Sequence, residues 1–225
     1  MSGFDSLVGG GLITDRLYVL SGPPGSGKTT FSAQFAAEGL ADGESCMYVT
    51  MHETESELVR DMSSFDFGFE RAAGSDGFRF INLIEKTGTS LTDPGSAHAG
   101  VGALTDKIVA YANSRKVDRL IVDSTMLLEH FFADGEDEVT GFLTALKEGE
   151  ATTLLVSEMT DPSAYANEHF LAHGVIFFHN FLDATGMTRG IQVVKMRGAE
   201  IDTDIRPLAF SDAGLTVDPE GDVEV

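Results

Sequence analysis

The segment SGPPGSGKTT, residues 21–30, restricts the fold more than any other part of the chain. It fits the pattern G-x-x-x-x-G-K-[ST], in which a glycine-rich loop wraps phosphate groups. An apolar run at 18–20 precedes it, and a helical pattern with Phe31 and Phe35 four residues apart follows it. This order predicts a phosphate-binding loop rather than a glycine-rich turn with an incidental lysine. We expect the nucleotide to be contacted by Gly22, Pro23, Pro24, Gly25, Ser26, Gly27, Lys28, Thr29 and Thr30.

The residue types in this loop also suggest roles. Backbone N–H groups and the positive end of the following helix attract the phosphates, and Lys28 should reach the β- and γ-phosphates. The Thr29 hydroxyl should bind Mg²⁺, with Asp123 as the second magnesium residue, because Asp123 ends the apolar run 120–123. An aspartate there could instead cap the next helix. Ser124 and Glu158, at or just beyond neighbouring strand ends, could sense the γ-phosphate or orient water, or serve structure only.

Hydrophobic patterning predicts an α/β fold. Apolar strands at 46–51, 78–83, 120–123 and 153–157 alternate with helical patterns, one of which opens on a capping box formed by Thr54 and Glu57. Residues 86–100 have the composition of a loop, and strands near 174–181, 189–197, 206–210 and 214–218 follow. We therefore expect a RecA-like P-loop core within one domain, 1–225: a mainly parallel sheet flanked by helices and extended by C-terminal antiparallel strands.

The charge balance constrains the surroundings and the partners. Thirty-six acidic residues face fifteen basic ones, for a net charge of −21. Repulsion among these like charges is relieved by concentrated salt. We therefore expect a protein of a haloarchaeal, salt-accumulating cytoplasm rather than an ordinary acidic protein. The single cysteine, Cys46, fits a reducing cytoplasm, and the absence of a membrane-length apolar run argues against a membrane partner. Residues 120–146 and 159–172 contain no Lys or Arg, which disfavours DNA as a partner.

Several further segments make the chain resemble the KaiC-like branch of the RecA superfamily from end to end. They include the opening FDSLVGGGL, the strands MYVTMHETESEL, LIVDS and LLVSE, and the C-terminal segments HGVIFF, RGIQVVKMRG and LAFSDAGLTVDP. The KMRG segment after HGVI is the most specific of these. The resemblance implies ATP with Mg²⁺, and a homo-oligomer, often a hexamer, with ATP at subunit interfaces.

Two positions within these segments bear on catalysis. Period-two spacing predicts that Lys195 and Arg197 share a strand face with Ile191 and Val193. The two cations could simply protect a solvated edge strand. The resemblance implies instead that they reach the γ-phosphate bound by the neighbouring subunit. The family usually has two adjacent glutamates after the second strand, the first resembling the base that polarises water. Here the pair is His52-Glu53, so we expect slow turnover.

These features leave three functional hypotheses. The first is an oligomeric, slowly hydrolysing ATPase whose nucleotide state regulates contact with an unidentified protein partner. The second is a non-hydrolysing nucleotide-sensing scaffold or regulator, which the His52 substitution favours. The third and least supported is a RecA-type DNA-binding recombinase paralogue. His169 and His173, four residues apart, could share a helical face like a zinc pair, with His179 nearby, but packing or surface histidines are the better interpretation.

Overall fold

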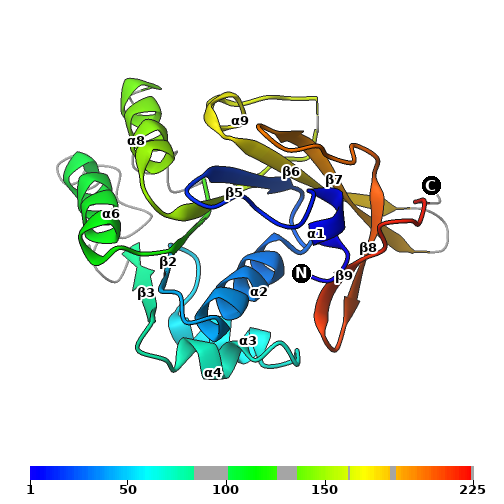
Figure 1. The fold of residues 1–225 in the computed structure, drawn as a ribbon, viewed down its shortest axis with the longest axis horizontal. Coiled ribbons are helices and arrows are strands. Elements are labelled where there is room, and N and C mark those ends of the chain that lie inside the picture. The colour runs from blue at the N-terminus through cyan, green and yellow to red at the C-terminus, as the bar shows by residue number, and fades with distance from the viewer. Residues whose placement is uncertain (84–100, 126–135, 162, 183–185, 224–225) are drawn as a thin grey trace.

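The computed structural model describes the chain except for residues 84–100, 126–135, 162, 183–185 and 224–225 (Figure 1). The loop expected at 86–100 lies outside the described residues. Within the described part, the strands form one nine-stranded sheet in the order β3-β2-β4-β5-β1-β6-β7-β8-β9. The strands are β1 Leu17–Gly22, β2 Cys46–Thr50, β3 Phe78–Asn82, β4 Arg119–Asp123, β5 Thr152–Glu158, β6 Gly174–Leu182, β7 Met187–Met196, β8 Arg206–Ser211 and β9 Gly214–Val217.

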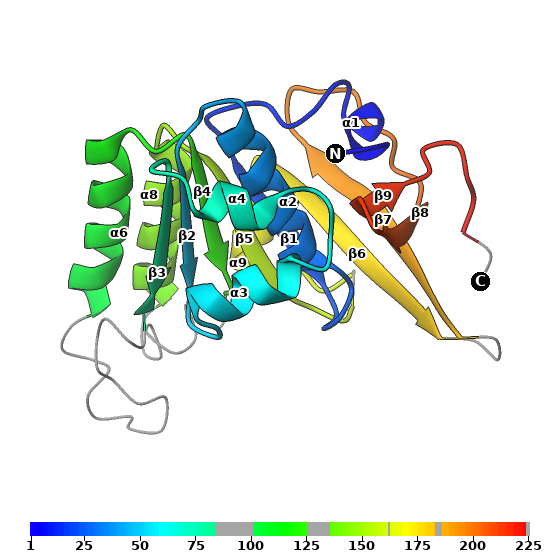
Figure 2. The same ribbon diagram turned by 90° about the horizontal axis from the view of Figure 1, so that it is seen from below.

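Helices cover both faces of this sheet, as Figure 2 shows from below. The helices are α1 Phe4–Leu7, α2 Lys28–Ala41, α3 Glu55–Met62, α4 Phe69–Ala73, α6 Val101–Arg115, α8 Glu136–Glu148 and α9 Asn167–Leu171. Side chains of α1 to α4 pack with one buried cluster that includes Tyr18, Tyr48 and Ile176. Side chains of α6, α8 and α9 pack with a second cluster that includes Val19 and Val175 on the other face.

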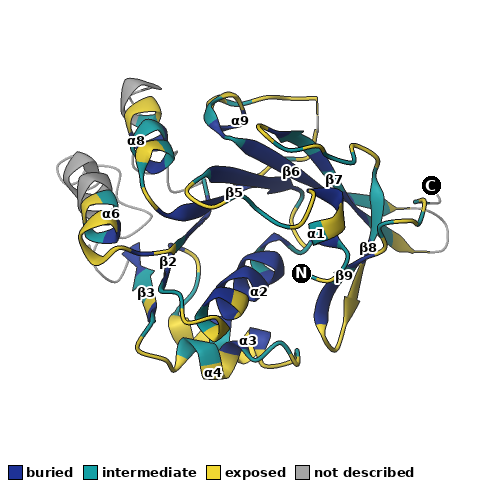
Figure 3. Cartoon of the chain, viewed as in Figure 1, coloured by how far each residue is buried: buried dark blue, intermediate teal, exposed yellow. Residues whose placement is uncertain are grey.

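The central strands are buried because helices lie on both sides of them, and Figure 3 shows this burial around β1, β5 and β6. Strands β1 and β4 carry continuous apolar runs, as strands shielded on both faces do. Pairing is parallel from β3 to β6 and antiparallel from β6 to β9. The expected fold class is confirmed: a mainly parallel, helix-flanked sheet extended by C-terminal antiparallel strands.

The local predictions are mostly confirmed. The expected strands occur within two residues of their predicted ends. The capping box is also present, because the Thr54 side chain accepts from the backbone N–H of Glu57 and the Glu57 side chain accepts from the backbone N–H of Thr54. No helix in the described ranges combines the length and the hydropathy that crossing a membrane requires.

One prediction about a strand face is wrong. Strand β6 pairs Ile176 with Val193 but Val175 with Lys195, so β7 carries an extra residue between these pairs. This β-bulge reverses the alternation of side chains. Lys195 consequently shares the face of Val175, opposite to the face on which Ile191 and Val193 are buried.

Candidate functional site

The loop between β1 and α2 has a backbone that requires glycine. Gly22 has a φ of 150°, and a Cβ atom there would lie 2.5 Å from the carbonyl oxygen of Phe178. Gly27, just before α2, has a φ of 109°. Both φ values lie in a region that side chains strongly disfavour. The glycines of the motif are therefore needed for the path of the loop, which brings the N-terminus of α2 to the carboxyl end of β1.

The Lys28 side chain, at the start of α2, points into this loop region. The Lys28 ammonium donates to the carbonyl oxygens of Gly22 at 2.8 Å and Pro23 at 2.9 Å. Burial lowers the pKa of Lys28, while the negative charges of Glu158 and Asp123 act in the opposite direction. A cation next to the N-terminus of a helix, where backbone N–H groups also attract anions, is suited to bind phosphate.

The carboxylate of Asp123 lies beside the loop. Its Oδ2 atom accepts hydrogen bonds from Thr29 Oγ1 at 3.0 Å and from the Tyr48 hydroxyl at 2.8 Å. Burial raises the pKa of Asp123, and the two hydrogen bonds act against that rise. A hydroxyl and a carboxylate in contact are oxygen donors of the kind that Mg²⁺ prefers. This pair therefore fits a magnesium ion bound together with phosphates, as expected for Thr29 and Asp123.

The pair after β2 lies near the same sheet edge. His52 Nε2 is 3.4 Å from Ser124 Oγ. This contact links the segments that follow β2 and β4. The backbone carbonyl of Glu53 accepts a hydrogen bond of 2.8 Å from Asn82 Nδ2. Burial, together with the negative charge of Asp123 and then of Asp61, raises the pKa of Glu53 from 4.5 to about 7. A carboxylate with this pKa is suited to accept a proton near neutral pH.

A cavity of about 240 Å³ joins the loop residues to Asp123 and Glu158. Phe210 of β8 forms part of its wall although no sequence pattern singled it out. The Arg189 guanidinium lies over the Phe210 ring, 5.0 Å from its centroid, and its Nε donates to Gly25 O at 3.4 Å. No local signal in the sequence marked Phe210, Arg189 or Tyr48, because their positions depend on which strands are neighbours in the sheet.

The structure does not bring Lys195 and Arg197 to this cavity within one chain. Met196 pairs with Gly174, which in turn pairs with Tyr18, so this segment lies at the amino end of β1. Gly22 is four residues further along β1, or about 13 Å at the usual rise of a strand. The Lys195 ammonium donates to the carbonyl oxygens of His169 and Phe170 at 2.9 and 3.1 Å.

The histidines have other partners. His169 is 3% exposed, and its Nε2 lies 2.7 Å from Ser21 Oγ. The backbone N–H of Leu17 donates to His173 Nδ1 at 3.1 Å, and His179 Nε2 lies 3.1 Å from Gln192 Oε1. Within the described ranges, no three His, Cys, Asp or Glu side chains are placed to hold a metal ion. His169, His173 and His179 each contact a hydrogen-bonding partner instead.

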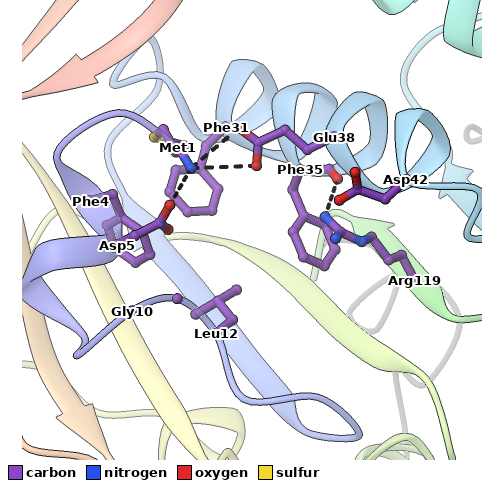
Figure 4. Close-up of a pocket in the computed structure, with 11 residues that line it drawn as sticks. Met1, Phe4, Asp5, Gly10, Leu12, Phe31, Phe35, Glu38, Asp42 and Arg119 are labelled. Carbon is purple, nitrogen blue, oxygen red and sulfur yellow. Dashed lines mark hydrogen bonds and ion pairs between the residues drawn. The ribbon is translucent and has the colours of Figure 1, made fainter.

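A second cavity, of about 310 Å³, lies around the C-terminal half of α2 (Figure 4). In this cavity the Met1 ammonium donates hydrogen bonds to the carboxylates of Asp5, at 2.8 Å, and Glu38, at 3.4 Å. Asp42 also lines the cavity. Arg119, at its other end, donates to Phe35 O at 2.6 Å and pairs with Glu44. Because both cations of this cavity are already paired with carboxylates, it is less suited to phosphate than the loop is.

The chain is similar to known proteins over most or all of its length. The family model described as "ATPase: KaiC" matches residues 1–222. The chain is 27% identical over 237 residues to the circadian clock oscillator protein KaiC of Parathermosynechococcus lividus, covering 100% of this chain and 42% of that protein. It is 27% identical over 205 residues to the circadian clock protein KaiC3 of Synechocystis sp., covering 88% of this chain and 40% of that protein. The chain thus spans less than half the length of these curated relatives.

A solved structure is similar over nearly the whole chain. It is a KaiC-like protein from the hyperthermophilic archaeon Pyrococcus horikoshii OT3, with a TM-score of 0.79 and 27% sequence identity. The match covers 97% of this chain and 96% of that one.

Proposed function

The chain belongs to the KaiC family of ATPases, and from this we propose that it binds Mg-ATP at the loop 22–30, hydrolyses it slowly, and acts as an oligomer through nucleotide-dependent contact with a partner protein. One observation carries the proposal. The carboxyl edge of the sheet brings together Lys28, Thr29 and Asp123. They lie beside the loop whose backbone conformation requires glycine. Residues 1–225 would act as one domain.

Binding follows from the residues around the loop. Backbone N–H groups at the start of α2 would hold the phosphates, and Lys28 would exchange its contacts with loop carbonyls for phosphate oxygens. Thr29 and Asp123 would hold the magnesium ion. Bound Mg²⁺ would neutralise charge that develops on the phosphates.

Hydrolysis requires a group that orients water and accepts its proton. Glu53 is our candidate because its raised pKa, about 7, lets it exchange protons near neutral pH. His52 is exposed and lies against Ser124, so it would orient the water or the neighbouring loop instead. Turnover would be slow, because Glu53 would take the role of the glutamate that the family usually has at the position of His52. This changes the position of the carboxylate, and positioning dominates phosphoryl transfer.

Assembly would complete the site. Lys195 and Arg197 lie at the sheet end opposite to their own phosphate loop, an arrangement that suits residues acting on the nucleotide of a neighbouring copy. Arg197 is exposed and Lys195 is half-buried, so a neighbour could reach both. We extend the proposal to a ring, with six copies as the number that the family resemblance suggests.

The surface charge suits a salt-rich haloarchaeal cytoplasm as the working environment, because a net charge of −21 is tolerated best where salt screens it. The same charge, and the lack of Lys and Arg at 120–146 and 159–172, argue against a DNA-binding role.

A nucleotide-sensing scaffold that does not hydrolyse ATP is the second candidate, and His52 in place of a glutamate is the observation that favours it. One experiment separates the two. We would measure γ-phosphate release from Mg-ATP in molar KCl over a range of protein concentrations. Specific activity that rises with protein concentration supports an ATPase completed by its neighbour. Tight ATP binding with no release in the same sample supports the scaffold, and absence of binding contradicts both.

A further inference from the structure

A buried tyrosine contacts the carboxylate of the magnesium site. We propose that Tyr48 is a positioning residue for magnesium, and that its hydroxyl fixes the orientation in which Asp123 meets the ion and its water shell. This role rests on the proposed function, because it concerns the magnesium that accompanies ATP. Neither the P-loop pattern nor the aspartate at the strand end predicts it.

The contact crosses two neighbouring strands. Tyr48 on β2 pairs with Ile121 on β4, two residues before Asp123. Its side chain is 0% exposed, and its hydroxyl donates to Asp123 Oδ2 at 2.8 Å. Thr29 Oγ1 donates to the same oxygen at 3.0 Å. Tyr48 therefore anchors the carboxylate from the sheet while Thr29 anchors it from the phosphate loop.

Convergence of both donors on Oδ2 restricts the carboxylate. Rotation about the side-chain bond would break both hydrogen bonds, so the plane of the group is held. Of the described residues, none donates to Oδ1, which leaves that oxygen for water in the shell of an ion. Partners that orient the residues of a metal site in this way commonly set metal affinity.

The hydroxyl is not needed to fill space. The Tyr48 ring stacks on Phe80 with centroids 5.9 Å apart and planes 13° apart, a contact that a phenylalanine would also make. A buried hydroxyl is costly unless it is hydrogen-bonded, and here it meets a carboxylate, which gives a strong, charge-assisted bond. The hydroxyl thus contributes through Asp123 rather than through packing.

The variant Tyr48→Phe removes only this oxygen. We would measure ATP affinity by calorimetry in molar KCl, first with EDTA and then over a range of Mg²⁺ concentrations. ATP affinity without magnesium should stay unchanged, and the Mg²⁺ concentration needed for half of the magnesium-dependent gain should rise about tenfold. Both readouts are of binding, so they do not depend on turnover.

The chain offers a matched control in Tyr18→Phe. Tyr18 is also 0% exposed and lies on the same face of the sheet, but its hydroxyl donates to the carbonyl oxygen of Ile13 at 2.9 Å. Its loss should leave the magnesium dependence as in the wild type. An unchanged magnesium dependence in folded Tyr48→Phe, or an equal shift in Tyr18→Phe, would overturn the role of Tyr48.

A double-mutant cycle tests the route through Asp123. In an Asp123→Asn background, adding Tyr48→Phe should cause no further change in magnesium dependence, and an additive change would contradict the proposal. The proposed function fails in a different way: wild-type protein would then bind ATP no better with Mg²⁺ than with EDTA. If the wild type responds to Mg²⁺ and Tyr48→Phe responds equally, only the role of Tyr48 is lost.

Discussion

Glu53 provides the sharpest test of the proposed chemistry, because the structure gives its pKa a direction, a value and a cause. Burial and the charge of Asp123 raise that pKa from 4.5 to about 7. If Glu53 accepts the proton of the attacking water, hydrolysis requires its ionised form. Catalysis should therefore increase as the pH rises through 7.

The size of this effect follows from simple titration. With a pKa of about 7, roughly 9% of Glu53 is ionised at pH 6 and roughly 91% at pH 8, so kcat/KM should rise about tenfold between them. Removing the group in Glu53→Gln should lower kcat by about 10²- to 10⁴-fold, the usual contribution of a general base. His52→Gln should reduce turnover less and should keep the pH dependence.

Phosphate release by wild type and both variants, measured from pH 5.5 to 8.5 in molar KCl, tests this reasoning. A wild-type profile that is flat across pH 7, or Glu53→Gln with near wild-type turnover, would refute it. Stability gives an independent check of the sign. The folded state holds a proton on Glu53 that the unfolded chain releases near pH 4.5, so wild type should lose stability relative to Glu53→Gln as the pH rises from 4.5 to 7.

Three further outcomes are expected. Lys28→Ala should weaken ATP binding about 100-fold or more, because the ammonium that binds phosphate is lost; unchanged affinity in a binding titration would contradict the phosphate-loop assignment. Arg197→Ala should leave ATP binding intact and lower turnover about 10³-fold, and wild-type turnover would exclude a role on the neighbouring copy's nucleotide. The melting temperature should rise steeply from dilute buffer to molar KCl as the charge of −21 is screened, whereas a cooperative melt at the same temperature in both would argue against salt adaptation.

Features set by a few adjacent residues could be predicted from the sequence. The phosphate loop and the capping box at Thr54 are of this kind, because glycine conformations and helix-end hydrogen bonds are local. Asp123 was also predictable, because a carboxylate that ends an apolar run lies at the carboxyl edge of a parallel sheet.

Features that depend on strand order or register could not be predicted in this way. In the sequence Tyr48 is one more aromatic residue of a buried strand, and only the pairing of β2 with β4 brings its hydroxyl to Asp123. Phe210 and Arg189 meet the loop because β7 and β8 extend the sheet beyond β6. The bulge before Lys195 carries no residue signal, and it alone reverses the face predicted for that lysine.

The antiparallel course of β7 bears on how many complete nucleotide sites an assembly can have. It places Lys195 and Arg197 near the amino end of β1, whereas the phosphate loop follows the carboxyl end of the same strand. Each copy would therefore supply cations to one neighbour and accept them from another. Copies joined head to tail either form an open row or close on themselves. An open row always leaves its last loop without cations from a neighbour, however long it grows. Only a closed arrangement has as many complete sites as it has chains.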